Sequence, residues 1–309
     1  MPALRFPLER LALSAALLAV TGCRGSDEPV RDTMFAARPA AAPIVDDFGD
    51  TIVAGAAARR IVSLNPTTTE ILFAIGAGTR VVGRTRWDVW PDSARLVPDL
   101  GDGIRPNVEA VLAARPDLVV LYASADNRTA AQRLRAAGVT TYAAKIDSIA
   151  EFERAAIALG RLTGDTARAR LTRDTVRAAL DAVHAATRGL KEPTVFWHVW
   201  DDPLITIGGG SYMTELVAIA GGRNVYADLP DVSPQVSRED VLRRDPDVVI
   251  AGPQGARRIA ADVAWRPLRA VRDGRIVVVD TNLVGRPSVR LGEAARSLAR
   301  LLHPGAALP

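Results

Sequence analysis

The chain has 309 residues, of which 48% are hydrophobic and 24% are charged, so it can form one large or two modest globular domains with a substantial core. Its net charge of +4 comes from arginines that are spread among acidic residues, and this distribution argues against a nucleic-acid-binding surface. The single cysteine excludes an internal disulfide.

Residues 1–22 have the pattern of a lipoprotein signal peptide. Arg5 and Arg10 give a positive start, an apolar run follows, and small residues lead directly to Cys23. The apolar run is too short to span a membrane, and a lone cysteine at this position is typical of a lipobox. We therefore expect lipidation of Cys23 and a flexible tether over residues 23–43. The alternative is an ordinary secretory signal followed by a chance cysteine.

Residues 44–163 have the pattern of an α/β lobe. The sequence predicts a small hairpin over 44–53, a buried strand over 60–64 and a helix over 67–75 that ends at a glycine. A further short strand is predicted over 81–83.

Two segments of this lobe recur later in the chain, in the same order. Residues 69–76 match 214–221, since both read Thr-Glu, five apolar residues and Gly. Residues 107–120 match 237–250, since both combine a helix N-cap, an early acid, Pro-Asp and an apolar strand. The fold predicted from this duplication is α/β with two similar lobes, the second over 191–305. The alternative is chance similarity between common helix–strand units.

A long helix is predicted to join the two lobes over 164–190. Asp165 can begin it, no Gly or Pro interrupts it up to Thr187, and Leu171, Val176 and Leu180 are assigned to an apolar stripe. Such a helix is stiff, so we expect limited hinge motion and a ligand cleft between the lobes.

Aromatic residues mark the predicted cleft, which should form where strands end. Four of the five tryptophans lie in two such regions, one for each lobe: Trp87, Trp90, Trp197 and Trp200. A strand over 194–200 should place Trp197 and Trp200 on opposite faces. Flat aromatic walls suit a large planar ligand, although some of these rings can instead belong to the core.

Polar candidates accompany these aromatics. Arg84, Arg86, Arg105 and Arg286 can meet an anionic or amide group of a ligand, or can instead be solvated or paired. His198 can bind iron or cobalt directly, but a structural histidine at a strand end is the commoner arrangement. The sequence shows no cluster of metal ligands, so no site for a free metal ion is predicted.

Several segments together resemble the periplasmic-binding family for vitamin B12 and ferric siderophores, of the type with a helical backbone. They are residues 60–70, 209–224 and 236–239 and the tail from Arg286 to Pro304, and the resemblance covers about 44–304. It implies two lobes bridged by one long helix, a ligand in the cleft, and an ABC permease dimer with its ATPase as partners. It also implies an extracytoplasmic location, here with a lipid anchor in the membrane, and it places an aromatic residue facing the ligand at Trp87.

The resemblance also suggests how the partner is recognised. In the family, one exposed acid on each lobe docks onto the permease, and Glu70 and Glu215 hold equivalent places in the repeat. The alternative is that each acid only favours the start of its helix. Residues 101–104 and 231–233 lack aromatics that some B12 binders have, which leaves siderophore or haem ligands open.

The predicted function is therefore capture of a corrinoid or a ferric siderophore by a substrate-binding lipoprotein of an ABC importer. The alternatives are a haem-binding protein of the same transport class and a surface lipoprotein without a transport role. The sequence has no Gly-x-Ser-x-Gly elbow, and the glycine run at 208–211 lacks the lysine of a phosphate loop. We therefore predict that the chain is not an enzyme and carries no cofactor other than its metal-chelate ligand.

Overall fold

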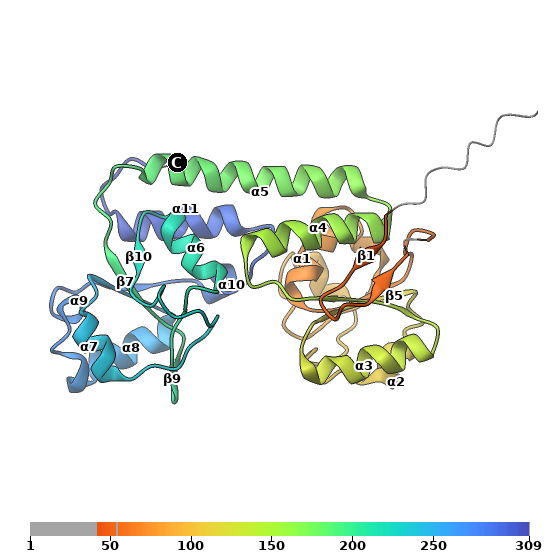
Figure 1. Cartoon of the computed structure of the whole chain (residues 1–309), viewed down its shortest axis with the longest axis horizontal. Helices are drawn as coiled ribbons and strands as arrows, with labels where there is room; N and C mark the ends of the chain where they lie inside the picture. The colour runs from red at the N-terminus through yellow and green to blue at the C-terminus, as the bar shows by residue number, and fades with distance from the viewer. Residues whose placement is uncertain (1–41, 54, 309) are drawn as a thin grey trace, which may run out of the picture. The chain divides into compact units, whose positions relative to one another are not determined.

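The computed structural model describes residues 42–53 and 55–308. The predicted signal peptide, Cys23 and most of the predicted tether lie outside the described residues. The described chain is α/β, with two four-stranded parallel sheets that helices cover (Figure 1). Within the described ranges, no helix is long and apolar enough to cross a membrane.

The first sheet belongs to the lobe predicted over 44–163. Its strand order is β4-β3-β5-β6, and its strands are apolar over almost their whole length because both faces are covered. The strands are β3 (Ile61–Leu64), β4 (Val81–Gly83), β5 (Leu118–Tyr122) and β6 (Thr140–Ala144). The helices are α1 (Pro66–Ala74), α2 (Val108–Ala113), α3 (Ala125–Ala136) and α4 (Ile149–Thr163). The predicted hairpin is present as β1 (Ile44–Val45) paired antiparallel with β2 (Thr51–Ile52).

The second sheet has the order β10-β7-β11-β12. Its strands are β7 (Thr194–His198), β10 (Arg223–Asn224), β11 (Val248–Ala251) and β12 (Ile276–Val278). A separate hairpin pairs β8 (Trp200–Asp201) with β9 (Leu204–Ile205). The helices are α6 (Tyr212–Ile219), α7 (Arg238–Arg244), α8 (Pro253–Ala261), α9 (Arg269–Arg272), α10 (Thr281–Val284) and α11 (Leu291–Leu302).

The duplication read from the sequence is present in the strand orders. In chain order, the first, second, third and fourth strands of each sheet take the same positions in the two sheets. The first matched pair of segments forms α1 and α6, which end next to Gly76 and Gly221 at φ +87° and +77°. The second pair forms α2 with β5 and α7 with β11. The prediction of two similar α/β lobes is therefore confirmed.

Successive side chains of each strand point to opposite faces of the sheet, and the two faces belong to different hydrophobic clusters. One hydrophobic cluster contains residues of both lobes and of α4, α5 and α11, including Leu118 on β5 and Trp197 on β7. The opposite face of each sheet has its own cluster, to which β5 contributes Val119 and β7 contributes Phe196.

The long helix α5 (Thr166–Thr187) packs against α4 of the first lobe and α11 of the second (Figure 1). Glycines allow close approach at both contacts: a Cβ added to Gly160 would lie 2.3 Å from Ala169 Cβ, and one added to Gly292 would lie 2.5 Å from Ala179 Cβ. The assignment of Leu171 to the buried stripe is wrong, since 68% of this side chain is exposed. It lies about 200° around the helix from buried Ala169.

Candidate functional site

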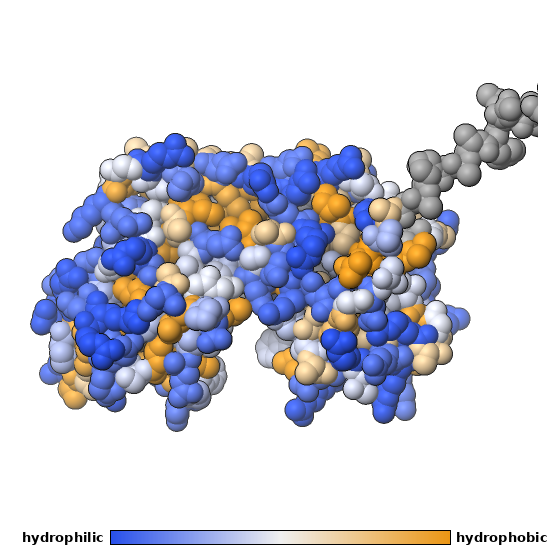
Figure 2. Space-filling model, viewed as in Figure 1, coloured by the Kyte–Doolittle hydropathy of each residue, from blue (hydrophilic) through white to orange (hydrophobic). Residues whose placement is uncertain are grey.

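Two adjoining cavities lie where the strands of the two sheets end. The first has a volume of about 460 Å³ and is lined by residues that follow β3, β4 and β5. The second has a volume of about 720 Å³ and is lined by residues that follow β7, β11 and β12. Gly285 lines both cavities, and Figure 2 shows the surface hollowed between the lobe with α2 and α3 and the lobe with α7 and α8. The cavities lie at the strand ends, as the parallel topology predicts.

Trp87 stands at the first cavity with 54% of its surface exposed. Its backbone is held on both sides, because its N–H donates to Thr85 Oγ1 (3.2 Å) and its carbonyl accepts from Arg286 Nη2 (2.6 Å). The neighbouring Asp88 is buried and accepts from Thr85 N–H (2.9 Å) and Thr69 Oγ1 (3.0 Å). The loop therefore presents an exposed indole on a fixed backbone.

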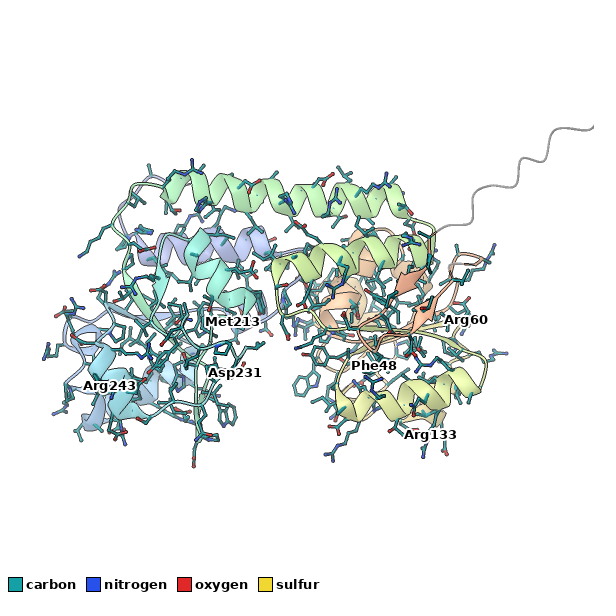
Figure 3. All side chains as sticks on the ribbon, viewed as in Figure 1. Phe48, Arg60, Arg133, Met213, Asp231 and Arg243 are labelled. Carbon is teal, nitrogen blue, oxygen red and sulfur yellow. The ribbon has the colours of Figure 1, made fainter. Side chains whose placement is uncertain are left out.

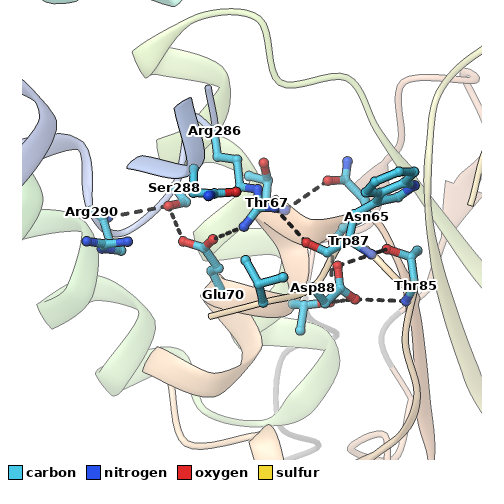
Figure 4. A network of polar contacts seen from close by, with 12 residues as sticks. Asn65, Thr67, Glu70, Thr85, Trp87, Asp88, Arg286, Ser288 and Arg290 are labelled. Atoms are coloured by element: carbon cyan, nitrogen blue, oxygen red, sulfur yellow. Dashed lines mark hydrogen bonds and ion pairs between the residues drawn. The ribbon is translucent and has the colours of Figure 1, made fainter. Parts of the chain in front are cut away.

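A buried ion pair connects this loop to the chain after α10 (Figure 4). Glu70 on α1 is 1% exposed; it accepts from Arg286 Nη1 (3.3 Å) and from the Ser288 hydroxyl. Burial raises the pKa of Glu70, although Ser288 and Arg286 act in the opposite direction. Arg286 lines the first cavity, so one guanidinium joins the cavity wall, the Trp87 loop and the buried carboxylate.

The docking role that the resemblance suggests for Glu70 and Glu215 depends on how exposed each carboxylate is. Glu70 is buried, and its carboxylate is enclosed by Arg286 and Ser288. Glu215 is half-buried and accepts from the Ile149 N–H (3.1 Å), and burial raises its pKa. Glu70 is therefore enclosed inside the protein, whereas Glu215 has one oxygen engaged by the Ile149 N–H and stays partly accessible.

The second cavity is lined by aromatic and basic side chains. Trp200 is 62% exposed, whereas Trp197 is buried against the core and reaches the cavity from β7. Met213, labelled in Figure 3, contributes a thioether from α6. Arg257 and Arg258 line the cavity from α8.

His198 lies in this cavity with its ring already engaged. Its Nε2 is 3.0 Å from Asp201 Oδ1, and Asp201 also pairs with Arg258. Gly255 packs closely on the ring, since an added Cβ would lie 2.5 Å from His198 Nδ1. Among the described residues, no group of three or more His, Cys, Asp or Glu could hold a metal ion. The geometry therefore favours the structural interpretation of this histidine.

The predicted strand over 194–200 is too long. β7 ends at His198, and Trp200 starts the hairpin of β8 with β9, where it pairs with Ile205. The Val199 N–H donates to the Ile205 carbonyl (2.9 Å), so the chain turns away from the parallel sheet at this residue. The hairpin, rather than β7, therefore brings the Trp200 indole to the second cavity.

Four predicted candidates are not among the residues that line the two cavities. Trp90 is half-buried under the Arg290 guanidinium, 5.4 Å from the ring centroid. Arg84 donates to the carbonyls of Thr85 and Ala94, and Arg86 is exposed beside Asp102. Arg105 lines a smaller cavity of about 270 Å³, which shares Asp126 with the first cavity.

Sequence reasoning missed several residues of the walls. In the first cavity they include Asp102 and Asn127, and in the second Met213, Gly255 and Arg257. Asn127 could have been found from the sequence, because it lies shortly after the end of β5, just as the predicted tryptophans lie near strand ends. Gly255 and Arg257 follow β11 in the same way, whereas Met213 gave no comparable local signal, because α6 reaches the wall only through the tertiary fold.

Comparison with known proteins gives a consistent result. A family model described as a periplasmic binding protein matches residues 61–283. A cobalamin-binding protein of Halobacterium salinarum is 32% identical, covering 95% of this chain and 83% of that protein. An ABC transporter substrate-binding lipoprotein of Bacillus subtilis is 28% identical, covering 95% of both chains.

Solved structures show the same fold. A periplasmic haem-binding protein from Roseiflexus has a TM-score of 0.72 at 26% identity, covering 81% of this chain and 99% of that one. The periplasmic vitamin B12-binding protein of Vibrio cholerae has a TM-score of 0.70 at 24% identity, covering 79% of this chain and 96% of that one. This fold is therefore shared by proteins that are named for different ligands.

Proposed function

Because the chain belongs to the periplasmic binding protein family, we propose that it captures a corrinoid outside the cytoplasm and delivers it to the permease of an ABC importer. The family consists of non-enzymatic transport components, so the prediction that the chain is not an enzyme is confirmed. Attachment to the membrane through a lipidated Cys23 is part of the proposal, supported by the lipobox pattern and by the Bacillus subtilis lipoprotein.

The pair of exposed indoles is the observation that carries this proposal. Trp87 and Trp200 stand on the walls of two adjoining cavities, and each exposes more than half of its surface. Large exposed aromatic surfaces mark binding sites, and flat rings stack well on a flat macrocycle. The two cavities meet at Gly285, so one large ligand can contact both indoles.

Two observations favour a corrinoid over the haem and siderophore alternatives. The Halobacterium salinarum relative is named for cobalamin, and its sequence identity to this chain is higher than that of the other three proteins described above. In addition, Asp102 and Asp126 disfavour an anionic group placed against the first wall, whereas Arg257 and Arg258 line the second cavity.

Ligand titration tests this proposal. The chain beginning after Cys23 is titrated with cyanocobalamin, haem, a ferric catecholate and a ferric hydroxamate, with tryptophan fluorescence and calorimetry as independent readouts. We expect saturable binding of cyanocobalamin and weaker or no binding of the others. Tight binding of haem without cyanocobalamin would establish the haem alternative instead.

For docking onto the permease, the repeat offers a better pair of acids than Glu70 and Glu215. Glu109 and Glu239 are exposed, and each is the second residue of an equivalent helix, α2 or α7. A helix that leads into a parallel strand begins at the edge of the sheet where the strands end, which is the edge of the cleft. Two matching carboxylates at the rim suit a partner with two-fold symmetry.

Uptake measurements test the docking pair. Glu109→Ala combined with Glu239→Ala should reduce ligand uptake at least tenfold while the dissociation constant stays within about twofold. Asp181→Ala with Glu192→Ala, exposed acids outside both cavities, serves as the matched control. Unchanged uptake in the Glu109 and Glu239 double variant would rule out this contact. A failure of the wild-type chain to support uptake in the presence of its permease would favour a surface lipoprotein without a transport role.

A further inference from the structure

Asn127 is a buried residue of the first cavity with an unsatisfied acceptor. The side chain is 1% exposed, and its Oδ1 has no hydrogen-bond partner among the described residues. Less than 1 Å² of this oxygen is exposed, so solvent does not satisfy it either. An unpaired buried acceptor is unfavourable and calls for a functional explanation.

The orientation of the Asn127 amide is fixed by its other end. Nδ2 donates to the Gly103 carbonyl (3.1 Å) and to the Tyr122 carbonyl (3.0 Å). Rotating the amide by 180° would place its oxygen against two carbonyl oxygens, so the observed assignment is the only favourable one. Oδ1 is therefore the atom left without a donor.

Asn224 shows what a purely structural asparagine looks like in the other lobe. It is also buried, and its Nδ2 donates to the Ile207 carbonyl (2.9 Å) and Thr214 Oγ1 (2.9 Å). Its Oδ1 accepts from the Tyr226 N–H (3.0 Å), so both ends of the amide are used. A structural role therefore explains both polar atoms of the Asn224 amide. For Asn127 it explains Nδ2 but not Oδ1.

The surrounding wall is rich in acceptors. Asp102 accepts from the N–H groups of Ile104 (2.9 Å) and Arg105 (3.2 Å), and these bonds lower the pKa of its carboxyl and keep it ionised. Asp126 lines the same cavity as a second carboxylate. The cation on this wall, Arg286, is already shared between Glu70 and the Trp87 carbonyl. The wall thus offers several oxygen atoms to N–H donors.

We propose that this wall recognises an uncharged amide of the ligand, whose N–H group donates to Asn127 Oδ1 as the wall relaxes around it. The inference rests on the proposed function and deepens it: the ligand is selected through the primary amides on the edge of the corrin ring, and not only through its flat face. A carboxylate in the same place has no proton to donate to Asn127 Oδ1 and would lie on the same wall as Asp102 and Asp126.

The first arm of the test changes the ligand and leaves the protein intact. Wild-type chain is titrated with cyanocobalamin and with each of its singly hydrolysed isomers, in which one peripheral amide is replaced by a carboxylate. We expect at least one isomer to bind about tenfold more weakly than cyanocobalamin. Equal binding of all the isomers would overturn the inference while leaving the proposed function intact. Failure to bind cyanocobalamin at all, with binding of an amide-free anionic chelate, would overturn both.

The second arm changes Asn127. Asn127→Leu should weaken cyanocobalamin binding about tenfold and reduce the discrimination against the affected isomer, because amide and side chain then no longer interact. The matched control Asn224→Leu should keep the full discrimination. Asn127→Ser is used if the leucine variant does not fold. Discrimination that is unchanged when Asn127 is replaced would exclude this residue as the acceptor.

Discussion

The two cavities share a scaffold but differ in chemistry. Both lie at the ends of parallel strands in sheets of the same order. The wall of the first is acidic, with Asp102 and Asp126, whereas α8 gives the second Arg257 and Arg258. The duplication thus preserved the strands and helices that build the cleft, while the loops that line it diverged. Such a cleft can bind one large ligand with chemically different side chains at its two edges.

Glu70 and Glu215 show the same divergence at a single position of the repeat. They are equivalent in sequence, yet Glu70 is sealed beneath Arg286 and Ser288, whereas Glu215 is half-buried beside the Ile149 N–H. Their equivalence in sequence therefore does not give them equivalent roles.

Stability measurements should show the largest difference between these two acids. Glu70→Ala should lower the free energy of unfolding by about 3 kcal/mol, because it leaves the Arg286 guanidinium partly buried without its carboxylate. Glu215→Ala should cost about 1 kcal/mol, since it removes one hydrogen bond from a half-buried site. Urea denaturation of the two variants measures both values.

A second substitution checks the reason for that loss. Arg286→Met in the Glu70→Ala background should recover part of the lost stability, because the unpaired charge is removed as well. Equal losses at positions 70 and 215 would show that the two acids have equivalent environments after all.

Ligand affinity should distinguish the two exposed tryptophans from the half-buried one. Trp87→Ala and Trp200→Ala should each weaken binding about tenfold, because each removes a ring from a cavity wall. Trp90→Ala should change affinity less than about twofold, since this ring packs under Arg290 instead. Calorimetric titration provides the measurement, and a larger effect at Trp90 than at Trp87 would contradict the assignment of the first wall.

The pH dependence of stability should give the smallest effect. Burial raises the pKa of Glu70 above the ordinary value of 4.5, so protonation favours the folded state. This contribution is complete below pH 4.5 and is lost as the pH rises through the higher folded-state pKa. Glu70→Gln cannot titrate, so its free energy of unfolding should fall less than that of wild type as the pH rises from 4.5 to 7. Parallel curves for the two proteins would contradict a raised pKa.

The sequence predicted the fold well because its main signals are local. Apolar strands, Pro-Asp helix ends and the Thr-Glu repeat depend on neighbouring residues, and they predicted both sheets and α5. The site was predicted only in part. Trp87 and Trp200 follow the strand-end rule, whereas the burial of Glu70 depends on Ser288, which lies 218 residues away. The unpaired oxygen of Asn127 likewise results from two backbone carbonyls that only the folded chain brings together.

The close seating of α5 on both lobes has a kinetic consequence. Gly160 and Gly292 pack directly against Ala169 and Ala179, so α5 should restrict how far the two lobes move when a ligand binds. A preorganised binding site loses little conformational entropy when the ligand binds. The association rate should then be limited by diffusion of the ligand into the cleft rather than by rearrangement of the protein. Rapid release of the ligand then requires a force that moves the two lobes apart. In an ABC importer, the permease can supply this force when it binds both lobes at the edges of the cleft.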